Sequence, residues 1–523
     1  MWDPMGFRSM NLESADVESI TYKLNDIDWD ILVDLCEQSN HGDEDGSYFS
    51  ELFRLTILQL YLESTEQKPT PIPKINNKPR GSRQRNVLIR RKKKLNAKLN
   101  ALKQRNPGSN KITQIQNDIF LLHVDIKDSI FAELQSREEK AVIAIKSNPK
   151  YFYSYAKQFS KLRSRIGPLD RGDGSYTDHP KEMADILQKQ FVSSFSDPAD
   201  TKKKIPVSLH NSPTSTMDDI IFGIEDIEEA LNDISPGAGT SEEDIPSAIL
   251  KQCSKSLSYP IYLIWKKSFC TGIIPHQHKM QYVNPIYKNG DKVNPLNYRP
   301  ISLTSHIVKT FERVIRKRLV DYLEDNRIIS QSQHGFRRGR SCLSQLLKHY
   351  DNILHHNLNS SETDIIYLDF SKAFDKVDHE VLLKKISLLG ISGKLYRWLE
   401  NFLTGRKQSV VINGFSSTVE DVLSGVPQGS VLGPILFLLY INDLENITLN
   451  CIVGFFADDT RLSKDINTIE DMTSLQNDLN NVIQWSEENN MRLHESKFNF
   501  LCFSSPLGKF MRELPFVTNM IKY

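Results

Sequence analysis

Runs of apolar residues in the second half of the chain predict strands that end at acidic side chains. The run Ile365-Ile366-Tyr367-Leu368 is β-branched and aromatic, as strands usually are, and Asp369 follows it directly. A second run, Ile452-Val453, leads into Phe455-Phe456-Ala457-Asp458-Asp459-Thr460. An acid at the end of a strand points out of the sheet, so we expect these three carboxylates to converge in a cleft.

Apolar positions at helical spacing predict helices around these strands. The segment 282–288 is expected to be a further strand. Asn413-Gly414, between 408–412 and 418–422, predicts a β-hairpin. The expected helices cover residues 28–33, 48–62, 224–231, 245–263, 307–323, 379–389 and 431–444.

Basic residues are concentrated upstream of these elements. Pro69, Pro71 and Pro73 mark a linker, and residues 78–105 contain many Lys and Arg and no acid. The basic run 90–94 suits a solvated helix face, a nuclear-import signal or a phosphate-binding surface. Aromatic and basic residues interleave over 148–165, which suits either helix core positions or a single-strand-binding surface.

The composition limits the class of protein. A chain of 523 residues has room for roughly two to four domains, and 39% hydrophobic with 25% charged residues is ordinary for a globular protein. The six cysteines form no CxxC pair, which favours a reducing intracellular compartment, nuclear or cytoplasmic. The N-terminus does not resemble a secretory signal, and the apolar stretch around 437–440 is too short for a membrane span. We therefore expect no membrane role.

The three acids suggest a particular chemistry. Carboxylates are the ligands that Mg²⁺ prefers, and Mn²⁺ is a possible substitute. Two such ions about 4 Å apart can clamp the attacking and leaving oxygens of a phosphoryl transfer. Taken singly, Asp369 is more often a helix cap, and Asp458-Asp459 more often a solvated turn. With the loop 424–430 before an apolar helix between them, the ordered set points to nucleotidyl transfer.

These segments resemble the reverse transcriptases, and more narrowly those of non-LTR (LINE-type, jockey-like) retrotransposons. The resemblance implies an RNA-directed DNA polymerase with an α+β right-hand fold: fingers and a palm with an antiparallel sheet, behind a mostly helical N-terminal region. The segments that carry it lie roughly between residues 225 and 505, and are 285–288 with 297–303, 333–337, 368–375, 424–430, 456–459 and 485–497.

The same resemblance implies a division of the chain. A helical spacer with a proline-containing linker is followed by a basic helical region that binds nucleic acid, then by the fingers, the palm and an atypical tail. The corresponding ranges are 1–77, 78–200, 201–360, 361–505 and 506–523.

The resemblance also implies the metal ligands. Asp369, Asp458 and Asp459 would hold two Mg²⁺ ions that activate a primer 3′-hydroxyl for attack on a dNTP. An RNA template, a DNA primer and dNTPs are the implied partners, and protein partners are left unknown.

Six further residues match positions that contact the substrate. Phe374 would lie under the incoming sugar, where its ring leaves no room for a 2′-hydroxyl. Gln428 and Gly429 would contact template and nucleotide. The cationic positions would clamp the triphosphate or protonate the pyrophosphate leaving group: Lys288 and Arg337 in the first role, Lys497 in the second.

Departures from the family leave an alternative open. The family normally carries an upstream endonuclease and a downstream thumb, and we expect neither in this chain. The turn at 236–244 also departs from the family's glycine-proline-aspartate pattern. The alternative is a retrotransposon-derived fragment that binds nucleic acid without polymerising. An RNA-dependent RNA polymerase is disfavoured, because Phe374 stands where that family has a second Asp.

Overall fold

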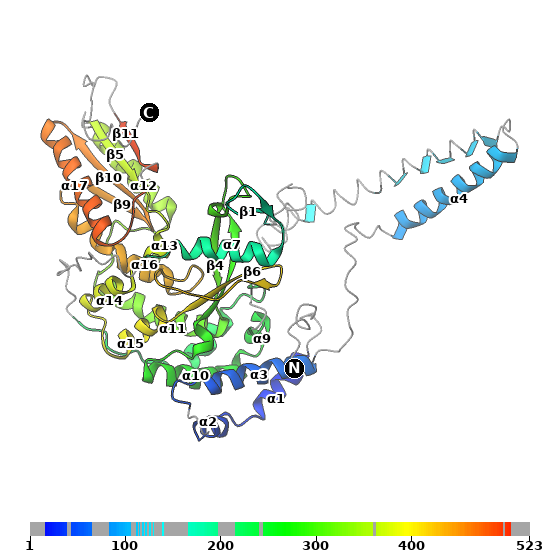
Figure 1. Ribbon diagram of the computed structural model, residues 1–523, viewed down its shortest axis with the longest axis horizontal. Coiled ribbons are helices and arrows are strands. Elements are labelled where there is room, and N and C mark those ends of the chain that lie inside the picture. Colours follow the sequence, from blue (N-terminus) through cyan, green and yellow to red (C-terminus); the bar gives the residue numbers. More distant parts are fainter. Residues whose placement is uncertain are drawn as a thin grey trace. The chain divides into compact units, whose positions relative to one another are not determined.

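The computed structural model describes residues 16–38, 43–64, 83–105, scattered positions between 111 and 140, and then 166–196, 215–239, 244–358, 362–494 and 497–503. The chain divides into two compact units, residues 68–165 and the remainder. In the smaller unit the longest described element is the helix α4 (Arg83–Arg105), which carries the basic run 90–94 (Figure 1). The aromatic and basic stretch 148–165 lies outside the described residues.

The larger unit mixes helices and sheets, as the sequence predicts. Its helices are α1 (Val17–Asn25), α2 (Trp29–Glu37), α3 (Ser47–Ser64), α7 (Pro180–Val192), α8 (Ile224–Asn232), α9 (Ser247–Gln252), α10 (Ser254–Thr271), α11 (His306–Asp325), α12 (Cys342–Leu358), α13 (Ala373–Lys376), α14 (His379–Leu388), α15 (Gly393–Leu403), α16 (Gly433–Ile441) and α17 (Ile469–Glu488), with short 3-10 turns η3 (His276–Lys279), η4 (Pro295–Asn297) and η5 (Asn442–Ile447). Its strands are β1 (Leu169–Asp170), β2 (Tyr176–Thr177), β3 (Met280–Tyr287), β4 (Tyr298–Leu303), β5 (Glu362–Leu368), β6 (Lys407–Ile412), β7 (Phe415–Ser416), β8 (Glu420–Asp421), β9 (Ile452–Phe456), β10 (Asp459–Ile466) and β11 (Asn499–Phe503).

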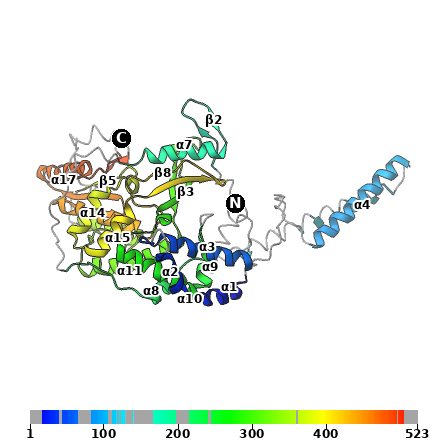
Figure 2. The same cartoon turned by 60° about the horizontal axis from the view of Figure 1, so that its bottom comes forward.

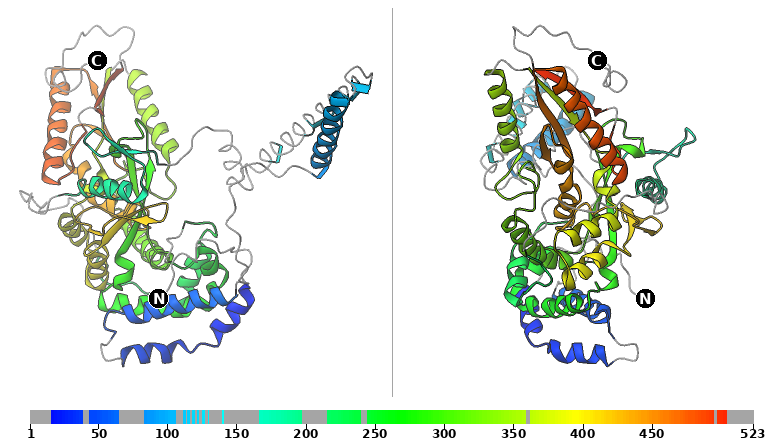
Figure 3. Two further views of the ribbon diagram at one scale, coloured as in Figure 1. Left: turned by 45° about the vertical axis from the view of Figure 1, so that its right-hand side comes forward. Right: turned by 90° about the vertical axis from the view of Figure 1, so that its left-hand side faces the viewer.

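The acidic motifs lie on a four-stranded antiparallel sheet of order β11-β5-β10-β9. Ile366, Leu368 and Leu462 belong to the main hydrophobic core, as do apolar residues of α17. Tyr367 is on the other face of β5, where its hydroxyl meets His349 of α12. The helices α12 and α17 therefore flank the sheet from opposite sides (Figure 3).

The second sheet is mixed rather than purely antiparallel. Its order is β4-β3-β6-β7, with β8 also paired to β6, and β3 runs parallel to β6. The helix α7 packs on it and closes a smaller core (Figure 2), whose buried members are Leu169, Met183, Ala184, Leu187, Phe191, Val283, Tyr298, Val410 and Ile412.

The hairpin predicted around Asn413-Gly414 is present, but its second strand is interrupted. Both turn residues have positive φ, 49° and 81°, as this tight turn requires. The return strand begins at once as β7, not at residue 418, and resumes as β8. Val411 pairs with Ser416 and Lys407 with Asp421, so the return strand holds one extra residue, which breaks the ladder.

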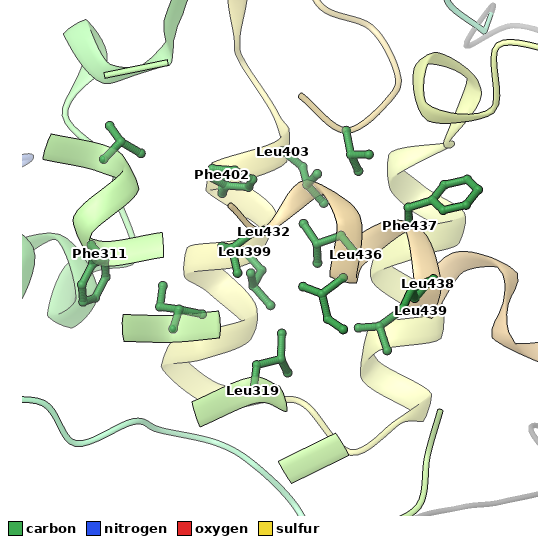
Figure 4. Packing of buried hydrophobic residues seen from close by; sticks show 14 of the residues in the cluster. Phe311, Leu319, Leu399, Phe402, Leu403, Leu432, Leu436, Phe437, Leu438 and Leu439 are labelled. Atoms are coloured by element: carbon green, nitrogen blue, oxygen red, sulfur yellow. The ribbon is translucent and has the colours of Figure 1, made fainter. Parts of the chain in front are cut away.

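The main core joins the N-terminal helices to the rest of the larger unit. Ile20, Phe53 and Ile57 are fully buried in the same cluster as Ile261 and Phe311. Figure 4 shows the centre of this packing, where side chains of α11, α15 and α16 interleave. None of the described helices has the length and apolar character needed to cross a bilayer.

Two helix predictions need correction. The run 245–263 is two helices, because Cys253 leaves the helical region with ψ of 20° between α9 and α10. The helix predicted over 431–444 is shorter, beginning at Gly433 and tightening into η5 after Ile441. Its start is set by Glu312, whose carboxylate accepts the amides of residues 431 and 432.

Candidate active site

A cleft of about 1580 Å³ opens beside the edge where β5 ends and β10 begins. Seven of the nine residues expected from the sequence line it: Asp369, Asp458, Asp459, Phe374, Gln428, Lys288 and Lys497. Segments far apart in the sequence thus meet at one surface.

Strand register brings the three acids together. Thr460 pairs with Leu368 across β10 and β5, so Asp459 and Asp369 lie at the same end of neighbouring strands. Asp459 also pairs with Phe456, which leaves Ala457 and Asp458 as the two-residue turn between β9 and β10. Asp458 is therefore a turn residue, whereas we expected it to lie at the end of a strand. Its half-buried carboxyl faces the cleft from the tip of the hairpin.

The turn is held in shape by a segment more than a hundred residues upstream. Ala457 has φ of 55°, an unfavourable value for a residue with a Cβ. Gln333 binds both polar groups of its backbone: Oε1 accepts from the amide at 3.0 Å, and Nε2 donates to the carbonyl at 3.3 Å. A Cβ on Gly335 would come within 2.3 Å of the Ala457 nitrogen, so only glycine fits there. Neither residue was expected from the sequence to have a positioning role.

The acids influence one another electrostatically. Burial raises the pKa of Asp458, and the negative charges of Asp459 and Asp369 raise it further. Burial and the charge of Asp369 likewise raise the pKa of Asp459. Lys497 opposes both shifts, and its ammonium forms an ion pair with the Asp369 carboxylate.

The donor chemistry of this cluster suits a hard divalent cation, since it consists of carboxylates whose negative charges repel one another. In the arrangement seen in the structure, however, no three His, Cys, Asp or Glu side chains of the described residues lie close enough together to hold an ion. The contact of Lys497 with Asp369 occupies one of the carboxylates that would be needed.

Phe374 and Gln428 form the wall beside the acids. The Phe374 ring stacks on Phe437 of α16, with centroids 4.4 Å apart, and its edge meets Phe336. Gln428 donates from Nε2 to Asp375 Oδ1 at 2.7 Å. Burial raises the pKa of Asp375 to about 6, while this hydrogen bond lowers it. Asp375 therefore fixes the orientation of the Gln428 amide.

The structure does not bring Gly429 and Arg337 to this cleft. Gly429 has φ of 126° and packs on β4, where a Cβ would come within 2.4 Å of the Ser302 carbonyl oxygen. The Arg337 side chain is nearly fully buried and forms a two-pronged ion pair with Glu324. Its guanidinium also donates to the carbonyl of Ser330, so in this arrangement it holds the chain together.

The cleft lining is positive although the whole chain is nearly neutral, with a net charge of +1. Four aspartates, 369, 375, 458 and 459, face seven cationic side chains, which are Lys288, Arg299, Lys372, Lys376, Arg461, Arg492 and Lys497. Such a surface attracts polyanions, and it favours cations only next to the clustered acids.

Comparison with known proteins defines the class first. Residues 286–521 match the sequence model of the family described as "Reverse transcriptase (RNA-dependent DNA polymerase)". The matched part includes the acidic sheet, the loop 424–430 and most of the residues after 505. This part of the chain is a reverse transcriptase domain.

The relatives are named as RNA-directed DNA polymerases of mobile elements, jockey among them, which agrees with the resemblance to jockey-like non-LTR enzymes. The chain is 28% identical over 382 residues to the "RNA-directed DNA polymerase from mobile element jockey" of Drosophila funebris, covering 71% of this chain and 40% of that protein. It is 30% identical over 255 residues to the jockey enzyme of Drosophila melanogaster, covering 47% and 28%. It is 28% identical over 343 residues to the "Probable RNA-directed DNA polymerase from transposon X-element" of the same species, covering 64% and 37%. The chain thus spans less than half the length of each of these relatives.

Proposed function

We propose that this chain is an RNA-directed DNA polymerase of a non-LTR retrotransposon, which adds dNTPs to the 3′-hydroxyl of a primer. The observation that carries the proposal is the meeting of Asp369, Asp458 and Asp459 in one cleft of a reverse transcriptase domain. The positive lining of that cleft suits an RNA template, a DNA primer and nucleoside triphosphates.

In the proposed reaction Asp369, Asp458 and Asp459 would hold two Mg²⁺ ions. When bound, the ions would lower the charge on the reacting phosphate and activate the 3′-hydroxyl. Lys497 would leave Asp369 and turn to the pyrophosphate as its proton donor. Lys288, which also lines the cleft, would stabilise the triphosphate.

The remaining side chains would select and align the nucleotide. The Phe374 ring, fixed by its stack on Phe437, would exclude a 2′-hydroxyl. Gln428, oriented by Asp375, would contact the template base or the nucleotide. Gly429 would act indirectly, because its close approach to Ser302 fixes the loop that carries Gln428. We also propose that residues 201–360 form the fingers and residues 361–505 the palm of a right-hand polymerase fold.

The first prediction concerns the acid at the hairpin tip. Asp458→Asn keeps the size of the side chain and removes its charge, so primer extension on an RNA template should fall at least about a hundredfold. The measurement is Mg²⁺-dependent incorporation of dNTPs by purified protein. Asp421→Asn, an exposed change on β8, is the matched control and should leave the rate unchanged.

Two outcomes would contradict the proposal. Extension that survives in Asp458→Asn would remove this residue from the metal site. Wild-type protein that binds primer and template but never extends the primer would favour the binding-only fragment. The ion pair of Lys497 with Asp369 is the observation that keeps this second function in view.

A further inference from the structure

Arg461 is a buried cation in the wall of the cleft. It lies on β10 two residues after Asp459, so the two side chains project from the same face of the strand. Only 5% of the residue is exposed, and it lines the cleft. Within the described part of the chain its Nε has no hydrogen-bond partner, and no ion pair joins its guanidinium to a carboxylate.

The neighbouring strand is shaped to receive this guanidinium. Gly454 of β9 is the register partner of Arg461. A Cβ at Gly454 would lie 2.6 Å from Nε and 3.1 Å from Cζ, so any other residue would push the guanidinium away. The side chain thus lies across the neighbouring strand over a glycine, which fixes its direction.

The groups on the other side do not neutralise it. Tyr367 pairs with Arg461 across β5 and β10, and its hydroxyl lies 2.8 Å from His349 Nε2. Arg340, just before α12, and Lys348 of α12 are further cations, whose charges act with that of Arg461 on His334. A buried cation that forms no ion pair is costly, and an anion bound in the cleft would lower that cost.

We propose that Arg461 binds a phosphate group of the nucleic acid or nucleotide held in the cleft. A guanidinium suits this task because it can give two parallel hydrogen bonds to phosphate oxygens. Arg461 follows Asp459 by two residues on β10, so their backbones are about 6.7 Å apart along the strand. The guanidinium therefore lines the same cleft as the acids. The inference rests on the proposed function for the identity of the strand.

The test separates binding from catalysis. Binding of a fluorescent DNA primer annealed to an RNA template is measured by anisotropy in EDTA, where no extension occurs. Arg461→Gln should weaken binding at least about tenfold and lower the slope of log K against log salt by about 0.9. Arg397→Gln, an exposed change on α15, is the control and should do neither.

A second variant guards against loss of folding. Gly454→Ala keeps the arginine but displaces its guanidinium, so it should weaken binding as well, while thermal melting reports whether each variant is folded. A folded Arg461→Gln variant with unchanged duplex affinity and unchanged KM for dNTP would overturn the inference.

The two sources of phosphate give different results. A weaker duplex affinity assigns the contact to the primer or template backbone, and a raised KM for dNTP with normal duplex affinity assigns it to the triphosphate. Wild-type protein that binds the duplex without extending it would defeat the proposed function alone, and the effect of Arg461→Gln on binding would still stand. Wild-type protein that binds no duplex, even at low salt, would overturn both.

Discussion

At the scale of single residues, the cleft depends on groups that hold other groups in place. Asp375 is one of them, since its carboxylate accepts from Gln428 and its pKa is raised to about 6 by burial. Gln333 and Gly335 are others, because they fix the turn that carries Asp458. Each acts through a neighbour and not on the substrate.

The burial of Asp375 should make the stability of the protein depend on pH, and replacement of this residue should remove that dependence. Its pKa lies above the ordinary value of 3.8, so the folded protein binds the proton more tightly and loses stability as pH rises from about 4 to about 6. Asp375→Asn keeps an acceptor for Gln428 and removes this slope. At pH 7 it should be the more stable protein, by on the order of 1–3 kcal/mol.

Urea unfolding at pH 4.5 and pH 7.5 measures the effect. Asp351→Asn, an exposed change on α12, is the control and should follow the wild type at both values. A wild-type protein whose stability rises between the two pH values, with no difference in Asp375→Asn, would contradict the assignment.

Sequence reasoning found the acids that line the cleft more readily than the residues that position them. Asp369, Asp458 and Asp459 stand beside apolar runs, so the pattern alone suggested that they meet. Arg461 owes its place to strand register and to a glycine on another strand, and Gln333 acts on a turn 124 residues further along the chain. Nothing in the local pattern of residues reports such a relation. Arg337 is the opposite case. The motif predicted that it contacts the triphosphate, but in the structure it forms an ion pair with Glu324.

At the scale of elements, the loop before α16 is anchored from a distant helix. Glu312 of α11 is fully buried, and one of its carboxylate oxygens accepts from the amides of Val431 at 2.7 Å and Leu432 at 2.9 Å. These amides have no partner within the helix, because they precede its first turn. The anchor thus holds α16 and, through it, the adjoining loop with Gln428.

Removal of this anchor should destabilise the protein. Glu312→Ala leaves two buried amides without an acceptor, at a cost of roughly 1–3 kcal/mol for each. Glu312→Gln keeps a carbonyl oxygen at the same place and should lose less. The free energy of unfolding in urea gives the comparison, and equal stability of the two variants would refute the anchoring role.

Helix and strand type was easier to predict than element boundaries. The strand β5 and the helices α11 and α14 follow the apolar pattern closely. The interruption between β7 and β8 comes from one extra residue in the return strand, and the break between α9 and α10 from the backbone of Cys253, and neither left a trace in the apolar pattern.

At the scale of the whole molecule, positive charge gathers in two places. One is the cleft lining, and the other is α4, whose 23 residues contain no acid. Because the rest of the chain compensates, the net charge of +1 hides both.

The helix α4 should contribute to nucleic-acid affinity without sequence preference. Changing Arg90, Arg91 and Lys93 to Gln should flatten the salt dependence of duplex binding by about 0.9 for each phosphate that the helix no longer neutralises. Lys317, Lys384 and Arg397, exposed on the other unit, changed together to Gln provide a control with the same loss of charge. Equal slopes for the two triple variants would leave α4 without a specific role in binding.

The burial of α1 and α3 in the main core has a practical consequence for recombinant work. The family match begins at residue 286, which invites expression of that part by itself. Such a fragment would uncover the apolar side chains of α11 that pack against residues upstream of the cut, Phe222 and Trp265 among them. Aggregation of such a fragment would then result from the position of the truncation. A soluble fragment should therefore retain residues 16–64 and 215–285.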